Sequence, residues 1–257
     1  GNTIIGSEAV ARSAPDGYTI LWQASAHVIN PLLFKTPYDA IKDFIPVGTV
    51  GSTELMLVVN PAVPLNSVQD VIAASKAKPD SLNYASTGVG GPPHIAAELF
   101  KSMTGTRIQH IPYKGVGPAM TDLVGGQVQI AFQTPAAALQ FVKTGKLRAL
   151  AISGDKRLPA LPDVPTFAEA GLSNFDVKFW FGVFVPAGTP KDIVDKLSAE
   201  VARIITVPEV VTKLDGAGLL PFTSTPVEFA KLVQTDSIRY ERLIKEASAF
   251  EFEAKEQ

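Results

Sequence analysis

The strongest constraint on the fold of this chain is a regular alternation between short apolar runs and longer segments with helical periodicity. Residues 54–59 (ELMLVV) and 179–185 (FWFGVFV) are continuous apolar runs rich in β-branched and aromatic residues, as in buried strands. Other segments carry apolar residues at helical spacing, such as residues 191–205, where Ile193 and Leu197 share a face. The alternation predicts an α/β fold with a parallel sheet built from strand–helix units.

Glycine, proline and asparagine separate these runs and set the expected boundaries of each element. We expect strands at residues 18–23, 54–59, 82–85, 107–111, 128–132, 148–152 and 179–185. We expect helices at residues 68–78, 93–103, 118–125, 135–143, 166–170, 191–205, 208–215 and 226–247. Ser67 is the expected N-cap of the first of these helices, because Asp70 follows three residues later.

Composition excludes several classes of partner and chemistry. The 257 residues suffice for two lobes, and the net charge of −2, without a basic run, gives no reason to expect a nucleic-acid partner or a membrane surface. The absence of cysteine removes thiol nucleophiles, disulfides and thiolate metal sites, and permits an oxidising compartment. We see no apolar run long enough to span a membrane and no signal-peptide pattern within these residues.

The most informative segment is residues 83–94 (NYASTGVGGPPH), where a predicted strand runs into a glycine-rich loop and then a helix. Gly88 and Gly90 let the main chain approach a ligand closely, and Ser86 and Thr87 add hydroxyl donors. The helix N-terminus behind the loop supplies unpaired N–H groups that attract an anion. An ordinary glycine-rich turn with its N-cap explains the same residues equally well.

A second loop and one aromatic residue are weaker candidates for a ligand site. Ser25 and Ala26 follow the predicted strand at 18–23, where ligands often sit in open α/β sheets, but Ser25 could instead cap the next turn. Trp180 lies in an apolar strand, which is more typical of a core residue than of a ligand platform. Lys114 is a possible anion partner, although a lone loop lysine is usually solvated.

The sequence carries no motif that indicates catalysis, a cofactor or a metal. There is no G-x-S-x-G elbow and no H-E-x-x-H, and the three histidines lack metal-ligand spacing. We therefore expect no enzyme activity, no metal site and no cofactor. The alternative is a hydrolase with Ser86 or Thr87 as nucleophile and His94 as base, and it fails if His94 points into the core.

Eight blocks, in order along the chain, together resemble one known family. They are APDGYTIL (14–21), INPLLF (29–34), NYASTGVGGPPH (83–94), IPYKG (111–115), LVGGQVQIAF (123–132), KLRALAIS (146–153), LPDVPTFAEAG (161–171) and FVPAGTP (184–190). They are similar to blocks of the TctC or Bug family, the substrate-binding components of tripartite tricarboxylate transporters.

The resemblance implies a type II periplasmic binding protein fold, with two α/β lobes joined by a hinge of crossover strands and the ligand in the cleft between lobes. Lobe 1 would comprise residues 1–60 and 182–257, and lobe 2 residues 61–181. The family normally begins with a further strand, a ligand-contacting loop and a helix, so we expect that segment to be missing before residue 1. A signal peptide is likewise expected outside these residues.

The same resemblance implies a monomer in the periplasm that captures a small carboxylate and delivers it to membrane transporter subunits. Carried over block by block, the ligand contacts fall to Ser25, Ala26, Ser86, Thr87, Gly88, Gly90 and Trp180. A sensory module that presents its ligand to a receptor is the other alternative, because the same two-lobe design serves both purposes.

Two departures from the family bear on the ligand. Gly91 and Pro92 stand where the loop usually carries Ser or Thr, and Pro92 has no N–H to donate. Gln133 is neutral where many members have an acidic residue at or beside this position. Since an ammonium group would then lack a partner, we expect a dicarboxylate or an aromatic acid rather than an amino acid.

Overall fold

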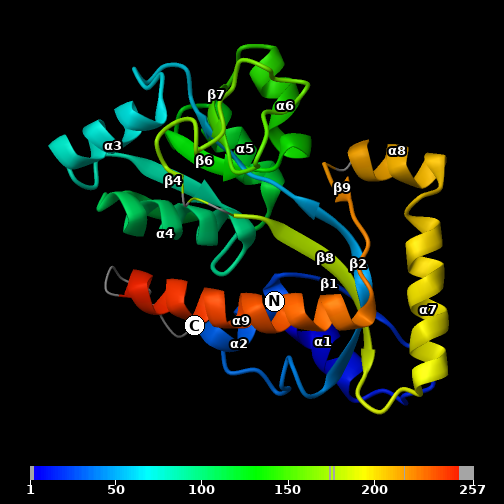
Figure 1. The fold of residues 1–257 in the computed structure, drawn as a ribbon. Coiled ribbons are helices and arrows are strands. Elements are labelled where there is room, and N and C mark those ends of the chain that lie inside the picture. Colours follow the sequence, from blue (N-terminus) through cyan, green and yellow to red (C-terminus); the bar gives the residue numbers. More distant parts are fainter. Residues whose placement is uncertain (1–2, 174, 176, 217, 249–257) are drawn as a thin grey trace. The chain divides into compact units, whose positions relative to one another are not determined.

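The computed structural model describes residues 3–173, 175, 177–216 and 218–248. Internal contacts divide the described residues into unit 1, which runs up to Thr53 and resumes at Phe179 with the C-terminal helices, and unit 2, which is Glu54–Lys178 (Figure 1). The chain therefore passes from unit 1 into unit 2 after Thr53 and returns after Lys178.

Unit 1 is built on an antiparallel sheet in the order β1-β8-β2-β9. Its strands are β1 (Leu21–Ala24), β2 (Phe44–Thr53), β8 (Phe179–Pro186) and β9 (Leu220–Pro221). Its helices are α1 (Ile4–Ala11), α2 (Ala26–Leu33), α7 (Lys191–Ile204), α8 (Pro208–Gly216) and α9 (Pro226–Ser248). Successive residues of a strand face opposite sides of a sheet, so β8 serves two cores.

The two faces of β8 pack against different helices. Val183 and Val185 join Val194 of α7 in one apolar cluster (Figure 1, α7 in yellow). On the other face, the rings of Trp180 and Phe184 contact Phe229 of α9, with centroids 5.1 and 4.9 Å away. Both faces of the strand are thus buried, which explains why its sequence is continuously apolar.

Unit 2 has a mixed five-stranded sheet in the order β5-β4-β6-β3-β7. Its strands are β3 (Met56–Val59), β4 (Asn83–Ser86), β5 (Gln109–Pro112), β6 (Ile130–Gln133) and β7 (Arg148–Ile152). Its helices are α3 (Val68–Ala77), α4 (Pro92–Thr104), α5 (Val116–Val124) and α6 (Pro135–Lys143). Strands β5, β4 and β6 are parallel, whereas β3 runs antiparallel to both β6 and β7.

Most predicted elements of unit 2 are confirmed, including the Ser67 cap, whose Oγ accepts the Asp70 N–H at 3.1 Å. The prediction of a parallel sheet is wrong for unit 1 and for the β3 and β7 side of unit 2. The strand expected at 18–23 begins only at Leu21, and Tyr18 is 93% exposed. The helix expected at 166–170 is a turn, closed by the Ala170 N–H donating to the Thr166 carbonyl at 2.9 Å.

Candidate functional site

The three parallel strands of unit 2 end at one edge of its sheet. Ser86 at the end of β4 is in register with Pro112 of β5, and Ala85 is in register with Ala131 of β6. The residues that follow these strands therefore gather along this edge, which is where open α/β sheets usually bind ligands. Lys114, just beyond β5, is exposed and has no partner among the described residues.

Hydrogen bonds inside the loop after β4 fix its shape. The N–H groups of Gly88 and Gly90 donate to Ser86 Oγ and His94 Nδ1, at 3.1 Å each, and the Gly91 N–H donates to the Gly88 carbonyl at 3.3 Å. Gly88 and Gly90 have φ of 124° and 78°, which side-chain-bearing residues rarely adopt. The loop therefore uses most of the N–H groups that the sequence analysis assigned to an anion.

Helix α4 also offers fewer donors than expected, because its first two residues, Pro92 and Pro93, have no N–H group. The Thr87 hydroxyl is different, since it is half-buried and has no hydrogen-bond partner among the described residues. Of the four predicted ligand residues in this loop, Thr87 is the one whose side-chain donor is available in this arrangement.

Gln133 ends β6 at the same edge and carries a second available donor. The residue is 1% exposed, and its Nε2 has no partner in the part of the chain that the structure describes. A buried amide N–H without an acceptor costs about 1–3 kcal/mol. Such a group is a natural place for a ligand oxygen to bind.

Ser86 pairs with a histidine that sequence reasoning had not connected to it. Its Oγ lies 2.6 Å from His110 Nε2 on the neighbouring strand β5. His94 is 5% exposed, and its Nδ1 accepts the Gly90 N–H, so it does not form the pair with Ser86 that the hydrolase alternative requires. Ser86 is itself fully buried and already bonded to Gly88. A nucleophile must reach its substrate, so this geometry does not favour the hydrolase alternative.

In unit 1, the N-terminus of α2 carries the second group of predicted residues. Ser25 is fully buried, and its Oγ accepts the Trp180 N–H at 3.0 Å. The main-chain N–H groups of Ala26 and His27, in the first turn of α2, have no partner among the described residues. Ala26 is partly exposed, so this helix end offers the donors that α4 lacks.

Trp180 is part of the unit 1 core in this structure. It is 3% exposed, and its indole N–H donates to Asp236 Oδ2 on α9 at 2.7 Å. The ring is also perpendicular to Phe229 at a centroid distance of 5.1 Å. Its expected contact with ligand stays a prediction.

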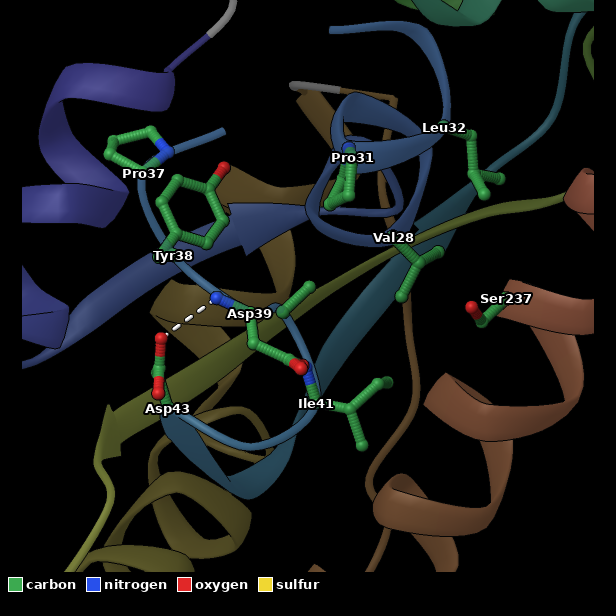
Figure 2. A pocket seen from close by; sticks show the side chains of 10 residues that line it. Val28, Pro31, Leu32, Pro37, Tyr38, Asp39, Ile41, Asp43 and Ser237 are labelled. Carbon is green, nitrogen blue, oxygen red and sulfur yellow. Dashed lines mark hydrogen bonds between the residues drawn. The ribbon is translucent and has the colours of Figure 1, made fainter. Parts of the chain in front are cut away.

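Unit 1 also contains a cavity of about 590 Å³ (Figure 2). It lies between α2, the segment 37–43 and Ser237 of α9, and the described residues that line it include none of the seven predicted ligand residues. Asp39 and Asp43 contribute carboxylates, and Asp43 Oδ2 accepts the Asp39 N–H at 2.7 Å, as Figure 2 shows. Two carboxylates would repel an anion, so this cavity is not suited to an anionic ligand.

A family model described as "Tripartite tricarboxylate transporter family receptor" matches residues 1–249. The chain belongs to this family. BugT of Bordetella pertussis is 36% identical over 249 residues, which cover 96% of this chain and 76% of BugT.

Solved structures of relatives share the fold. The structure titled "R. palustris Rpa4515 with adipate" is 32% identical, has a TM-score of 0.87, and covers 96% of this chain and 84% of its own. "MatC (Rpa3494) from Rhodopseudomonas palustris with bound malate" is also 32% identical, with a TM-score of 0.84 and coverages of 95% and 85%. The expected type II periplasmic binding protein fold is thus confirmed at the level of fold class.

The family is one of solute-binding receptors and not a family of enzymes. In the part of the chain that the structure describes, no helix is long and apolar enough to cross a bilayer.

Proposed function

We propose that this protein binds a small carboxylate in the periplasm and delivers it to the membrane subunits of a tripartite tricarboxylate-type transporter. Membership of the receptor family supports this role. The structures of two relatives with the same fold are named as complexes, one with adipate and one with malate, and both ligands are dicarboxylates.

Uncharged donors carry the binding in this proposal. Unit 2 by itself offers the donors of Thr87 and Gln133, and unit 1 by itself offers the N–H groups of Ala26 and His27 at the start of α2. A helix N-terminus favours negative charge, so this arrangement needs no lysine or arginine. Ser25, Ser86, Gly88, Gly90 and Trp180 complete the proposed site.

The buried amide of Gln133 is the single observation that most supports a carboxylate without an amino group. Its Nε2 needs an acceptor, which a carboxylate oxygen supplies. A neutral side chain gives no ion pair to an ammonium group. The proposed ligand is therefore a dicarboxylate or an aromatic acid in preference to an acidic amino acid.

Isothermal titration calorimetry with malate, adipate, benzoate and aspartate tests this proposal. We expect the wild type to bind at least one of the first three acids more tightly than aspartate. Gln133→Asp replaces the donor with a second negative charge, so it should weaken binding of that acid by about tenfold or more. Gln140→Asp, on the exposed face of α6 in the same unit, is the matched control and should leave the affinity unchanged.

Two outcomes would contradict the proposal. If the wild type binds aspartate more tightly than each of the other three acids, the neutral Gln133 does not select against an amino group. Equal affinities of Gln133→Asp and Gln140→Asp would show that the buried amide does not contact the ligand.

A further inference from the structure

Two imidazoles form a stack directly beneath the loop at residues 86–91. His94 of α4 and His110 of β5 have ring centroids 4.4 Å apart, and the ring of Tyr84 lies 4.7 Å from His110 at an interplanar angle of 14°. His94 is buried and His110 is half-buried. Most of the surface of the stacked rings is therefore closed to solvent.

Each imidazole bonds to one end of the loop. His110 Nε2 meets Ser86 Oγ at 2.6 Å, and His94 Nδ1 accepts the Gly90 N–H at 3.1 Å. Ser86 Oγ in turn accepts the Gly88 N–H at 3.1 Å, which links His110 to the middle of the loop. The two ends of the segment 86–90 are thus held by two rings that contact each other.

The His94 bond requires an uncharged ring. A main-chain N–H can donate to Nδ1 only while that nitrogen keeps its lone pair, whereas in a protonated imidazole both nitrogens are donors. Protonation of His94 would set two N–H groups against each other. The Ser86 hydroxyl is more adaptable, because it can both donate and accept.

Burial and the positive charge of Lys101 oppose protonation of the two imidazoles. Lys101 Nζ lies over the Tyr84 ring at 5.8 Å from its centroid and pairs with Glu98 at 2.8 Å, while the Tyr84 hydroxyl donates to Glu98 at 2.5 Å. Burial, then His110 and Lys101, lower the pKa of His94 to about 3. Burial and Lys101 lower the pKa of His110 to about 4.

We propose that His94 and His110 are positioning residues for the ligand loop, holding its two ends in the shape that meets the carboxylate only while the His94 imidazole is uncharged. The role in ligand binding rests on the function proposed above. The effect on the loop is independent of any ligand and is measured without one.

Amide hydrogen exchange of Gly88 and Gly90, followed by NMR at pH 7, tests the positioning role. His94→Leu removes the acceptor and should lower the protection of Gly90 by about tenfold or more. His94→Asn places Oδ1 where Nδ1 lay, so it should restore protection to near the wild-type level. His110→Leu and His110→Gln form the equivalent pair for Gly88.

Tyr84→Phe is the matched control within the same stack. It removes the hydroxyl that bonds to Glu98 but leaves both imidazole–loop bonds intact. The variant should lose global stability without a selective loss of protection at Gly88 and Gly90.

A pH series separates positioning from simple packing. Opening of the loop frees the imidazoles to take up protons, so protection of Gly90 in the wild type should fall by about tenfold or more between pH 7 and pH 4.5. The double variant His94→Asn with His110→Gln should show little of this dependence. Global unfolding is followed in parallel through the amides of β3.

Three results would overturn the inference: unchanged Gly90 protection in His94→Leu, His94→Asn behaving like His94→Leu, or the same pH dependence in the double variant as in the wild type. A loop that responds as expected in a protein that binds none of the four acids supports the positioning role and contradicts only the proposed function.

Discussion

The bond between Trp180 and Asp236 shows how a single buried polar pair stabilises unit 1. Asp236 is 4% exposed and accepts the indole N–H at 2.7 Å, while Arg239 lies 3.3 Å from its other oxygen. Because this carboxylate is the acceptor of the indole N–H, removing it would leave a buried donor of a core tryptophan without its acceptor.

We predict that Asp236→Ala destabilises the protein by about 2–3 kcal/mol, the usual cost of an unsatisfied buried donor that had a charged partner. Asp236→Asn retains an oxygen acceptor and should cost less than Asp236→Ala. Urea unfolding at pH 7, followed by tryptophan fluorescence, measures both. Asp215→Ala, an exposed aspartate on α8 of the same unit, is the control and should change stability by less than about 0.5 kcal/mol. Equal effects of Asp236→Ala and Asp215→Ala would refute the prediction.

At the scale of residues, the sequence predicted which groups could bind a ligand, but not which of them are left without a hydrogen-bond partner in the fold. The glycine-rich segment was found because glycine and hydroxyl residues follow a strand. The internal bonds of Gly88 and Gly90 depend on His94 and Ser86 folding onto the loop. The contact between Ser86 and His110 follows from the pairing of β4 with β5, which the order of residues along the chain does not reveal.

At the scale of elements, β8 depends on the absence of a side chain at one position. Gly182 lies opposite Thr49 of β2, and a Cβ at this glycine would overlap the ring of Phe229 and approach the Gly48 carbonyl to 3.1 Å. The glycine therefore lets α9 pack directly against the strand, and the ring of Phe229 occupies the space that a side chain would need.

We predict that Gly182→Ala costs about 1–3 kcal/mol, because the new methyl group forces Phe229 or the strand to move. Thermal unfolding monitored by circular dichroism checks this. The matched control is Gly117→Ala at the start of α5, where a Cβ would meet nothing within 4 Å. That change should be neutral or stabilising by up to about 1 kcal/mol. A destabilisation by Gly117→Ala as large as that by Gly182→Ala would argue against the packing explanation.

Strands β2 and β9 were not predicted from the sequence, and the longer of them, β2, shows why the sequence pattern can fail to indicate a strand. Its sequence FIPVGTVGST contains Pro46, Gly48 and Gly51, residues that ordinarily indicate turns. In the structure, β2 pairs with β8 through two register shifts, between Pro46 and Gly48 and between Thr49 and Gly51. Bulges tolerate such residues within a strand, but they also erase the alternation by which a strand is recognised.

At the scale of the whole molecule, the order of elements could be predicted in unit 2, whereas the direction of the strands could not. Alternation of strands and helices suggested parallel pairing throughout, and this holds for β4, β5 and β6. The chain enters unit 2 through β3, which lies between β6 and β7 and is antiparallel to both. The fold class was predicted from the resemblance of eight sequence blocks to one family. No single helix or strand indicates it.

All three histidines are kept uncharged by the fold, which links its stability to pH. Burial lowers the pKa of His27 in unit 1 to about 4, with a weaker opposing effect from its bond to the Ala40 carbonyl. In unit 2, the pKa values of His94 and His110 are lowered to about 3 and about 4. The ordinary value is 6.5, so in each case the unfolded chain binds the proton more readily.

We therefore predict that acid destabilises the protein before its carboxylates titrate. As pH falls from 7 towards 4, the unfolded state takes up protons that the folded state refuses, so the free energy of unfolding should decrease by about 1–3 kcal/mol for each histidine. Urea unfolding at pH 7, 6 and 5 measures this decrease. Unit 2 contains two of the three histidines, so its free energy of unfolding should decrease more than that of unit 1. His27→Phe retains an aromatic ring between Phe44 and Phe184 but cannot titrate, so it should flatten the pH dependence of unit 1 alone. If the free energy of unfolding is constant over this range, the buried histidines are not the source of a pH-dependent stability.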